Sequence, residues 1–213
     1  MSRNTASLSP RPPKILVTDI TTESGIDFIH NNGATGEKLL PETMGSGILV
    51  FDFDGDGKQD IFLVNACYWP GTLPAGKQQT TGALYQNMGN ARFKNVTQGS
   101  GLDISIYGVG IAAGDYDNDG LPDIFITAVG GNHLFHNEGN GKFKEVTISS
   151  GVGGRPDGWS TSACFFDYDN DGKLDLFVCN YVRWNRETDL AVDYRLPGIG
   201  RAYGPPRNFS GDY

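Results

Sequence analysis

Aspartate is concentrated in three nine-residue segments of this chain. They are DFDGDGKQD at 52–60, DYDNDGLPD at 115–123 and DYDNDGKLD at 167–175. Each follows the pattern D-x-D-x-D-G-x-x-D, which places four carboxylates on one short stretch. Carboxylates this close together repel one another unless a cation neutralises them. The glycine at the sixth position permits the sharp turn that would make the carboxylates converge. The pattern therefore predicts three cation-binding loops.

Calcium is the cation that this set of oxygen ligands suits best. Ca²⁺ takes about six to eight oxygens in flexible geometry, whereas Mg²⁺ needs a near-ideal octahedron and keeps several waters. Zinc and copper favour His or Cys, which the loops lack. We expect one Ca²⁺ per loop, bound by the side chains at positions 1, 3, 5 and 9 and by the backbone carbonyl at position 7. The expected ligands are Asp52, Asp54, Asp56, Lys58 and Asp60; Asp115, Asp117, Asp119, Leu121 and Asp123; and Asp167, Asp169, Asp171, Lys173 and Asp175.

A single loop of this kind has a simpler explanation. Asp, Asn and Gly favour turns for local reasons, so one copy is equally well explained as a solvated turn. Three copies in one register favour metal binding. A helix–loop–helix calcium site is excluded, because it needs a bidentate Glu at position 12, where this chain has Leu63, Ile126 and Val178.

Apolar segments lie on both sides of every loop. GSGILVF precedes the first loop and IFLVNA follows it, and the other two loops have similar neighbours. Successive residues of a strand point to opposite faces of the sheet, so apolar residues on both faces indicate strands that are covered on both sides. Each loop is therefore predicted to join the two strands of a hairpin.

A longer repeat surrounds the loops. GALYQNMGNARFKNVTQGSGL at 82–102 matches NHLFHNEGNGKFKEVTISSGV at 132–152. With the preceding hairpin, each copy gives four antiparallel strands in a unit of about 50 residues, which is typical of a β-propeller blade. We therefore predict an all-β fold, a β-propeller of four-stranded antiparallel blades that is incomplete in this chain.

The predicted organisation has a flexible, Pro/Ser-rich lead at 1–13 and a propeller portion at 14–213. The portion divides into an isolated strand at 14–26, which resembles the end of a fourth strand, a blade at 46–102, a blade at 108–152 and a partial blade at 158–213. Insertions are expected at 66–81 and 186–213. Since a propeller leaves no exposed faces only when its ring is complete, we expect either further blades beyond this portion or self-association.

The remaining candidate residues carry weaker signals. His133 and His136 lie three apart on a predicted strand, so they should face opposite sides and not share a metal. Cys67, Cys164 and Cys179 are expected to be small buried apolar side chains, although a Cys67–Cys179 bridge is conceivable in an exported protein. The tryptophans Trp69, Trp159 and Trp184 favour packing over a carbohydrate-binding face. The sequence shows no nucleophile–base pair.

Composition excludes several classes of protein. The 213-residue chain has a formal net charge of −8 and a pI near 4.8, which argues against nucleic-acid binding, because phosphate contacts need a basic surface. No apolar run approaches the roughly 20 residues of a membrane span. The N-terminus lacks the apolar core of a signal peptide, so either the protein is cytoplasmic or its export signal lies outside this sequence.

The repeats resemble the FG-GAP/VCBS family of calcium-loop propellers, which is related to the head of the integrin α subunit. The segment ESGIDFIHNNGATGEKLLPETMGSGILVFDFDGDG further resembles the start of the ASPIC/UnbV proteins, to which cartilage acidic protein of animals is related. The resemblance covers residues 14–184. It implies a propeller of about seven blades, Ca²⁺ between the first and second strands of a blade, an extracellular or periplasmic setting, and a binding or adhesion role. The chain ends after its third loop, without the C-terminal segment of the ASPIC/UnbV proteins.

Two functions remain open. The first is a calcium-binding module that interacts with a protein or a glycan and does not catalyse a reaction. The alternative is an enzyme, a hydrolase or lyase, whose site is built at the propeller axis from several blades. Acid–base groups on the two insertions would favour the enzyme; the candidates there are Tyr68, Lys77, Arg183, Arg186, Asp193, Tyr194 and Arg195.

Overall fold

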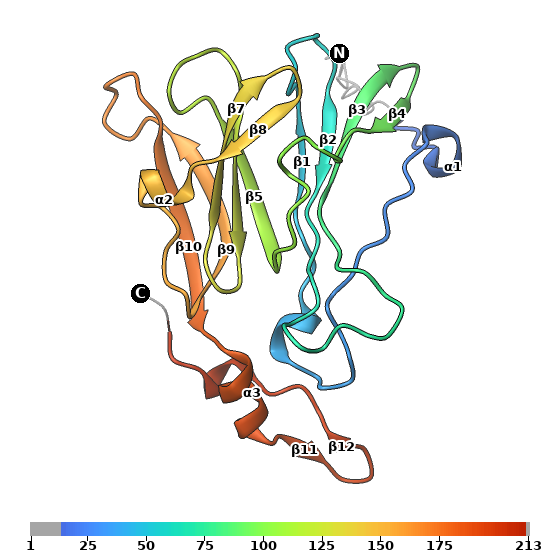
Figure 1. Ribbon diagram of the computed structural model, residues 1–213, viewed down its shortest axis with the longest axis vertical. Coiled ribbons are helices and arrows are strands. Elements are labelled where there is room, and N and C mark those ends of the chain that lie inside the picture. Colours follow the sequence, from blue (N-terminus) through green and yellow to red (C-terminus); the bar gives the residue numbers. More distant parts are fainter. Residues whose placement is uncertain (1–13, 212–213) are drawn as a thin grey trace, which may run out of the picture.

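Two four-stranded antiparallel sheets and a third hairpin form the body of the structure (Figure 1). The structure is a computed structural model and describes residues 14–211, so the predicted lead at 1–13 lies outside the described residues. The first sheet has the order β1-β2-β3-β4, the second β5-β6-β7-β8, and the third unit is the β9–β10 pair. Their bounds are β1 Ile48–Phe51, β2 Asp60–Leu63, β3 Ala83–Gly89, β4 Arg92–Asn95, β5 Gly108–Gly114, β6 Asp123–Ala128, β7 His133–Gly139, β8 Lys142–Glu145, β9 Gly158–Phe166 and β10 Asp175–Arg183.

Each acidic loop joins the two strands of a hairpin, as the sequence predicted. Phe51 pairs with Asp60 across the first loop, Gly114 with Asp123 across the second, and Phe166 with Asp175 across the third. The ninth residue of every loop is therefore also the first residue of the following strand. The three loops lie at one end of the molecule, and the C-terminal insertion lies at the other (Figure 1).

The three units stack side by side, with the second sheet in the middle (Figure 1). Strand β5 contacts both β1 and β9. All six residues of β6 are buried, which confirms the prediction of a strand covered on both faces. The apolar core of this region includes Phe62, Leu84, Ile124 and Phe135, each at most 1% exposed.

A second apolar cluster lies at the end of the sheets opposite the loops. Trp69 follows β2, Trp159 is the second residue of β9 and Trp184 follows β10, and all three are buried. The rings of Trp69 and Tyr107 stack with centroids 4.3 Å apart, and Trp184 lies 4.7 Å from Trp69. These contacts confirm the prediction that the tryptophans pack in the interior.

The predicted isolated strand at 14–26 is wrong. Residues 14–20 form no strand, and α1 (Thr21–Ser24) follows them. A strand needs a hydrogen-bonded neighbour, and the expected partner, a last blade, is not among the described residues 14–211. Ile15, Leu16 and Val17 are accordingly at least 78% exposed.

Short helices and a small hairpin complete the fold. Helix α2 (Thr147–Ser150) follows β8, and α1 similarly follows the residues VTDI at 17–20. Both helices end at a glycine with positive φ. The C-terminal insertion contains a helix, two short strands and a 3₁₀ turn. Their bounds are α3 Arg186–Val192, β11 Arg195–Leu196, β12 Gly200–Arg201 and η2 Pro206–Asn208, and an earlier 3₁₀ turn, η1, spans Leu40–Thr43. Within residues 14–211, no helix is long and apolar enough to cross a bilayer.

We predict that Gly101→Ala loosens the packing of the first unit against the second. A Cβ at Gly101 would lie 2.0 Å from the carbonyl oxygen of Phe143, at a φ of +91°. Gly76→Ala is the matched control, because its φ is +76° and no atom lies within 4 Å of the added Cβ. Both variants carry the left-handed backbone cost of about 1–2 kcal/mol, and Gly101→Ala should lose a further ~1–3 kcal/mol from overpacking. Equal free energies of unfolding for the two variants, measured in urea, would contradict this.

Candidate metal-binding loops

The first loop brings three of its predicted ligands together. Oxygen atoms of Asp52, Asp54 and Asp60 lie within 4.8 Å of one another. The carboxylate of Asp52 accepts hydrogen bonds from the backbone N–H groups of Gly55, Asp56 and Gly57, at 2.8–3.1 Å. These bonds hold the turn in shape. Asp56 does not join the group, because its carboxylate pairs with the ammonium of Lys58, and this pair lowers the pKa of Asp56.

The second loop has the same turn but a different set of converging groups. Asp115 accepts hydrogen bonds from the backbone N–H groups of Asp119 and Gly120, at 3.0 and 2.8 Å. Asp115, Asp117 and Asp119 present oxygens within 4.8 Å of one another, and position 5 therefore takes part here. The residue at position 7 is Leu121, so no lysine side chain competes for Asp119.

The third loop is the least complete. Asp167, Asp169 and Asp175 converge within 4.8 Å, and Asp167 accepts from the N–H groups of Asp171 and Gly172 as in the other loops. Asp175, however, is exposed, whereas Asp60 and Asp123 are 1% and 0% exposed. Within residues 14–211 the third unit consists of two strands, so no third strand among them covers this side of the loop.

The aspartate at position 9 connects each loop to its sheet. Asp60 accepts from the N–H of Phe53 in its loop at 3.1 Å and from the N–H of Asn87 in β3 at 2.6 Å. Asp123 does the same with Tyr116 at 3.1 Å and with Asn137 in β7 at 2.8 Å. Burial raises the pKa of both carboxyls above 3.8, and neighbouring loop carboxylates raise them further.

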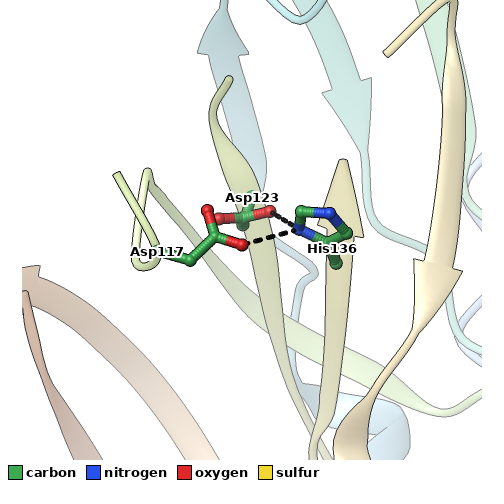
Figure 2. Close-up of side chains that lie close together, drawn as sticks. All are labelled: Asp117, Asp123 and His136. Atoms are coloured by element: carbon green, nitrogen blue, oxygen red, sulfur yellow. Dashed lines mark hydrogen bonds and ion pairs between the residues drawn. The ribbon is translucent and has the colours of Figure 1, made fainter. Parts of the chain in front are cut away.

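In each of the two four-stranded sheets, the third strand also places a polar side chain beside the acidic loop. Figure 2 shows this for the second loop. In the first sheet this is Gln86, whose Nε2 donates to Asp54 Oδ2 at 2.7 Å. In the second sheet it is His136, whose Nδ1 lies 3.1 Å from Asp123 Oδ1 and 3.4 Å from Asp117 Oδ2. His133 contacts Glu145 instead, at 2.7 Å, so the two histidines have separate partners.

Sequence reasoning missed the position of Gln86 and His136 beside the loops. The repeat alignment does contain the signal, because LYQN in the first unit matches LFHN in the second. The register pairs Ile61 with Tyr85 and Ile124 with Phe135. One residue further along, Asp60 and Asp123 therefore face Gln86 and His136. This pairing between strands cannot be read from the spacing within a loop.

Neighbouring loops are linked to one another. The amide of Asn137, which is fully buried, donates to the carbonyl of Phe53 in the first loop and to that of Pro122 in the second, at 2.9 and 3.1 Å. Asn118 in the second loop donates to the carbonyl of Gly172 in the third at 3.3 Å. The three loops thus form one connected end of the molecule.

These loops fit a hard divalent cation. Two oxygens that bind the same Ca²⁺ at about 2.3–2.6 Å can be at most about 5 Å apart, and the converging groups satisfy that limit. The carboxylate oxygens that accept backbone hydrogen bonds keep further lone pairs for an ion. Asp52, Asp54 and Asp60 would hold an ion in the first loop, Asp115, Asp117 and Asp119 in the second, where Asp123 converges with Asp117 and His136, and Asp167, Asp169 and Asp175 in the third.

The Cys67–Cys179 bridge that the sequence left open does not form, because Cys67, Cys164 and Cys179 are all free. Cys67 follows β2 in the first unit and Cys179 lies in β10 of the third, and the second sheet stands between these units. Cys67 packs against the tryptophan cluster, and burial raises the pKa of its thiol. Cys164 is exposed, which corrects the expectation of a buried side chain.

The C-terminal insertion is held by a buried carboxylate that sequence reasoning missed. Asp189 in α3 is fully buried and accepts from the backbone N–H of Leu40 and from Trp184 Nε1, both at 2.8 Å. It also pairs with Arg201 at 3.0 Å. Three of the predicted acid–base candidates are likewise engaged in ion pairs: Arg186 pairs with Glu37, and Arg195 pairs with Asp193.

Comparison with known proteins identifies the family. The family model for the FG-GAP-like repeat matches residues 52–126 and 115–178, which together cover more than half of the chain. The chain belongs to the FG-GAP-like repeat family. Cartilage acidic protein 1 of Xenopus tropicalis is 28% identical over 168 residues, which is 75% of this chain and 22% of that relative. The predicted resemblance is confirmed, and the chain spans about a fifth of the length of this relative.

We predict that the stability of the metal-free protein falls as pH rises above 3.8. A raised carboxyl pKa in the folded state means that the folded protein holds its protons better than the unfolded chain does. The stabilisation from Asp60 and Asp123 is therefore complete below their ordinary pKa of 3.8 and is lost as pH rises through the raised values. The pKa of the exposed Asp56 is lowered, so its contribution to stability changes with pH only below 3.8. Thermal melting in calcium-depleted buffer at a series of pH values above 3.8 tests this. A melting temperature that rises with pH there would contradict the prediction.

Proposed function

We propose that this chain is part of a calcium-stabilised β-propeller that binds a partner protein and does not catalyse a reaction. The observation that carries the proposal is the convergence of carboxylates in all three loops, each at the same place in its hairpin. Membership of the FG-GAP-like repeat family supports it. A glycan is the alternative ligand, and screening peptide and glycan arrays with and without calcium distinguishes the two.

Calcium would act by removing the repulsion within each loop. Without an ion, several carboxylates lie within a few ångströms of one another, and Asp60 and Asp123 are buried in addition. A bound divalent cation offsets both costs, because it neutralises the cluster and favours the charged form of the buried groups. The loops then stay closed and keep the neighbouring strands in register.

The propeller part of the proposal rests on the arrangement of the units. The two complete sheets and the third hairpin stack in sequence order, and each complete sheet has the four-stranded antiparallel topology of a blade. The third unit leaves Phe166 and Phe177 at 40% and 55% exposure. We propose that further blades, from a longer chain or from other copies, cover this face and close the ring.

The ion pairs of the C-terminal insertion support a binding role over the enzyme alternative. Arg186 and Arg195 have acidic partners, and Asp189 accepts hydrogen bonds from three donors. These charges hold the insertion in place. We further propose an extracellular or periplasmic setting, in which calcium sites of about 10⁻⁴–10⁻³ M affinity are occupied; the cytoplasm is the alternative.

We predict that Asp117→Asn weakens calcium binding to the second loop without unfolding the metal-free protein. The side chain of Asp117 contacts His136 and the other loop carboxylates, so a neutral amide removes a ligand charge and leaves the turn intact. Glu138→Gln is the matched control, because Glu138 is exposed on β7 and the charge change is the same.

The measurement is the shift in melting temperature on adding calcium. One ion at a hundredfold excess over its Kd stabilises the folded state by about 2.7 kcal/mol. Wild type and Glu138→Gln should show the full shift, and Asp117→Asn should lose the part that belongs to one site. If calcium leaves the wild-type melting curve unchanged, calcium binding is wrong.

A further prediction concerns the uncovered face. Exposed apolar patches drive association, so the chain should scatter light as species heavier than its 23.0 kDa, increasingly so at higher concentration. Phe177→Asp, on the uncovered hairpin, should reduce this association. Ile148→Asp is the control, because Ile148 is 97% exposed but lies in α2. A monomer at every concentration, or equal effects of the two variants, would contradict the prediction.

A further inference from the structure

The loops of the two four-stranded sheets share one acidic pattern but differ in the residue that the third strand places beside them. In the first sheet that residue is Gln86, which offers an amide, and in the second it is His136, which offers an imidazole. Both occupy the same position in the strand, directly beside the buried aspartate of position 9. The chain therefore contains its own comparison between a loop with oxygen ligands and a loop with a nitrogen ligand nearby.

His136 completes a compact three-residue group with two of the loop carboxylates (Figure 2). Ligand atoms of Asp117, Asp123 and His136 all lie within 4.8 Å of one another. The Nδ1 atom is the one directed at both carboxylates, at 3.1 Å from Asp123 and 3.4 Å from Asp117. The three side chains come from the loop, the start of β6 and β7, so the fold itself assembles the group.

These separations fall within the range of a first-row metal ion, and the nitrogen donor favours such an ion over calcium. Two ligands bound at about 2.0–2.2 Å, at the angles of an octahedral or tetrahedral site, lie about 3.0–3.5 Å apart. The nitrogen–oxygen distances of 3.1 and 3.4 Å fall within that interval. The Asp123 side chain is fully buried and His136 is 24% exposed, which limits competition from water. Imidazole is a preferred ligand of zinc and its first-row neighbours, whereas calcium takes oxygen.

We propose that the second loop prefers a first-row transition-metal dication such as Zn²⁺ or Co²⁺, bound through His136 Nδ1 together with Asp117 and Asp123. This inference rests on the proposed function in so far as both use the same loop. The first loop, with Gln86 in place of the histidine, keeps the preference for calcium. The two loops of one chain thus differ in metal selectivity through one residue on the third strand.

The test titrates the intact chain with Co²⁺ and, separately, with Ca²⁺, and follows the histidine ring signals by NMR. The sequence has three histidines, so the signal of His136 can be assigned from single variants. Co²⁺ should broaden the His136 signals first, and calorimetry should show that one Co²⁺ ion binds tightly per chain. His136→Gln should weaken the binding of that Co²⁺ ion tenfold or more and should change calcium affinity much less.

Two further variants keep the test decisive. Gln86→His should create a second tight Co²⁺ equivalent in the first loop, and this gain does not depend on how well His136→Gln folds. His133→Gln is the matched control, because it removes a histidine that pairs with Glu145 and not with a loop. Its Co²⁺ isotherm should match that of wild type.

The outcomes separate this inference from the proposed function. Unchanged Co²⁺ binding in His136→Gln, or an equal loss in His133→Gln, overturns the inference even if calcium binds. Calcium that binds no loop overturns the calcium part of the proposed function, whereas a Co²⁺ equivalent that depends on His136 still supports the inference.

Discussion

The buried carboxylate at position 9 is the group on which the loops and sheets both depend. Burying a charge is costly unless hydrogen bonds or a counter-charge compensate it. Asp60 and Asp123 each accept one N–H from their own loop and one from the third strand. Each therefore requires the loop and the strand to be in place together. A cation bound beside it would supply the remaining compensation, so metal binding and sheet formation would favour each other.

The third unit shows what happens without the third strand. Asp175 keeps the bond from its own loop, to Tyr168 at 2.9 Å, but it is exposed. A loop can therefore adopt the same turn from its local sequence alone, since the Asp and Gly positions specify the turn. A complete four-stranded sheet adds burial and a polar side chain from β3 or β7. The candidate metal-binding groups therefore differ because the sheets differ in completeness.

Connections between the loops extend this dependence across the molecule. Asn137 donates to carbonyls of two loops while its backbone N–H binds Asp123. A change in one loop therefore affects the sheet and the adjacent loop. At the opposite end, Asp189 and the tryptophan cluster hold the C-terminal insertion against the segment around Leu40. Buried polar groups thus hold the stacked units together at both ends.

The sequence by itself determined the three loops, the hairpins that carry them and the four-stranded units, because turn residues and strand periodicity act over a few neighbouring residues. It misplaced the strand at 14–26, whose expected partner is not among the described residues, and it left open a bridge between Cys67 and Cys179, which lie in different units. Only the tertiary structure decided which side chains face the loops. Strand register places Gln86 and His136 beside Asp60 and Asp123, and register between strands is a property of the folded sheet.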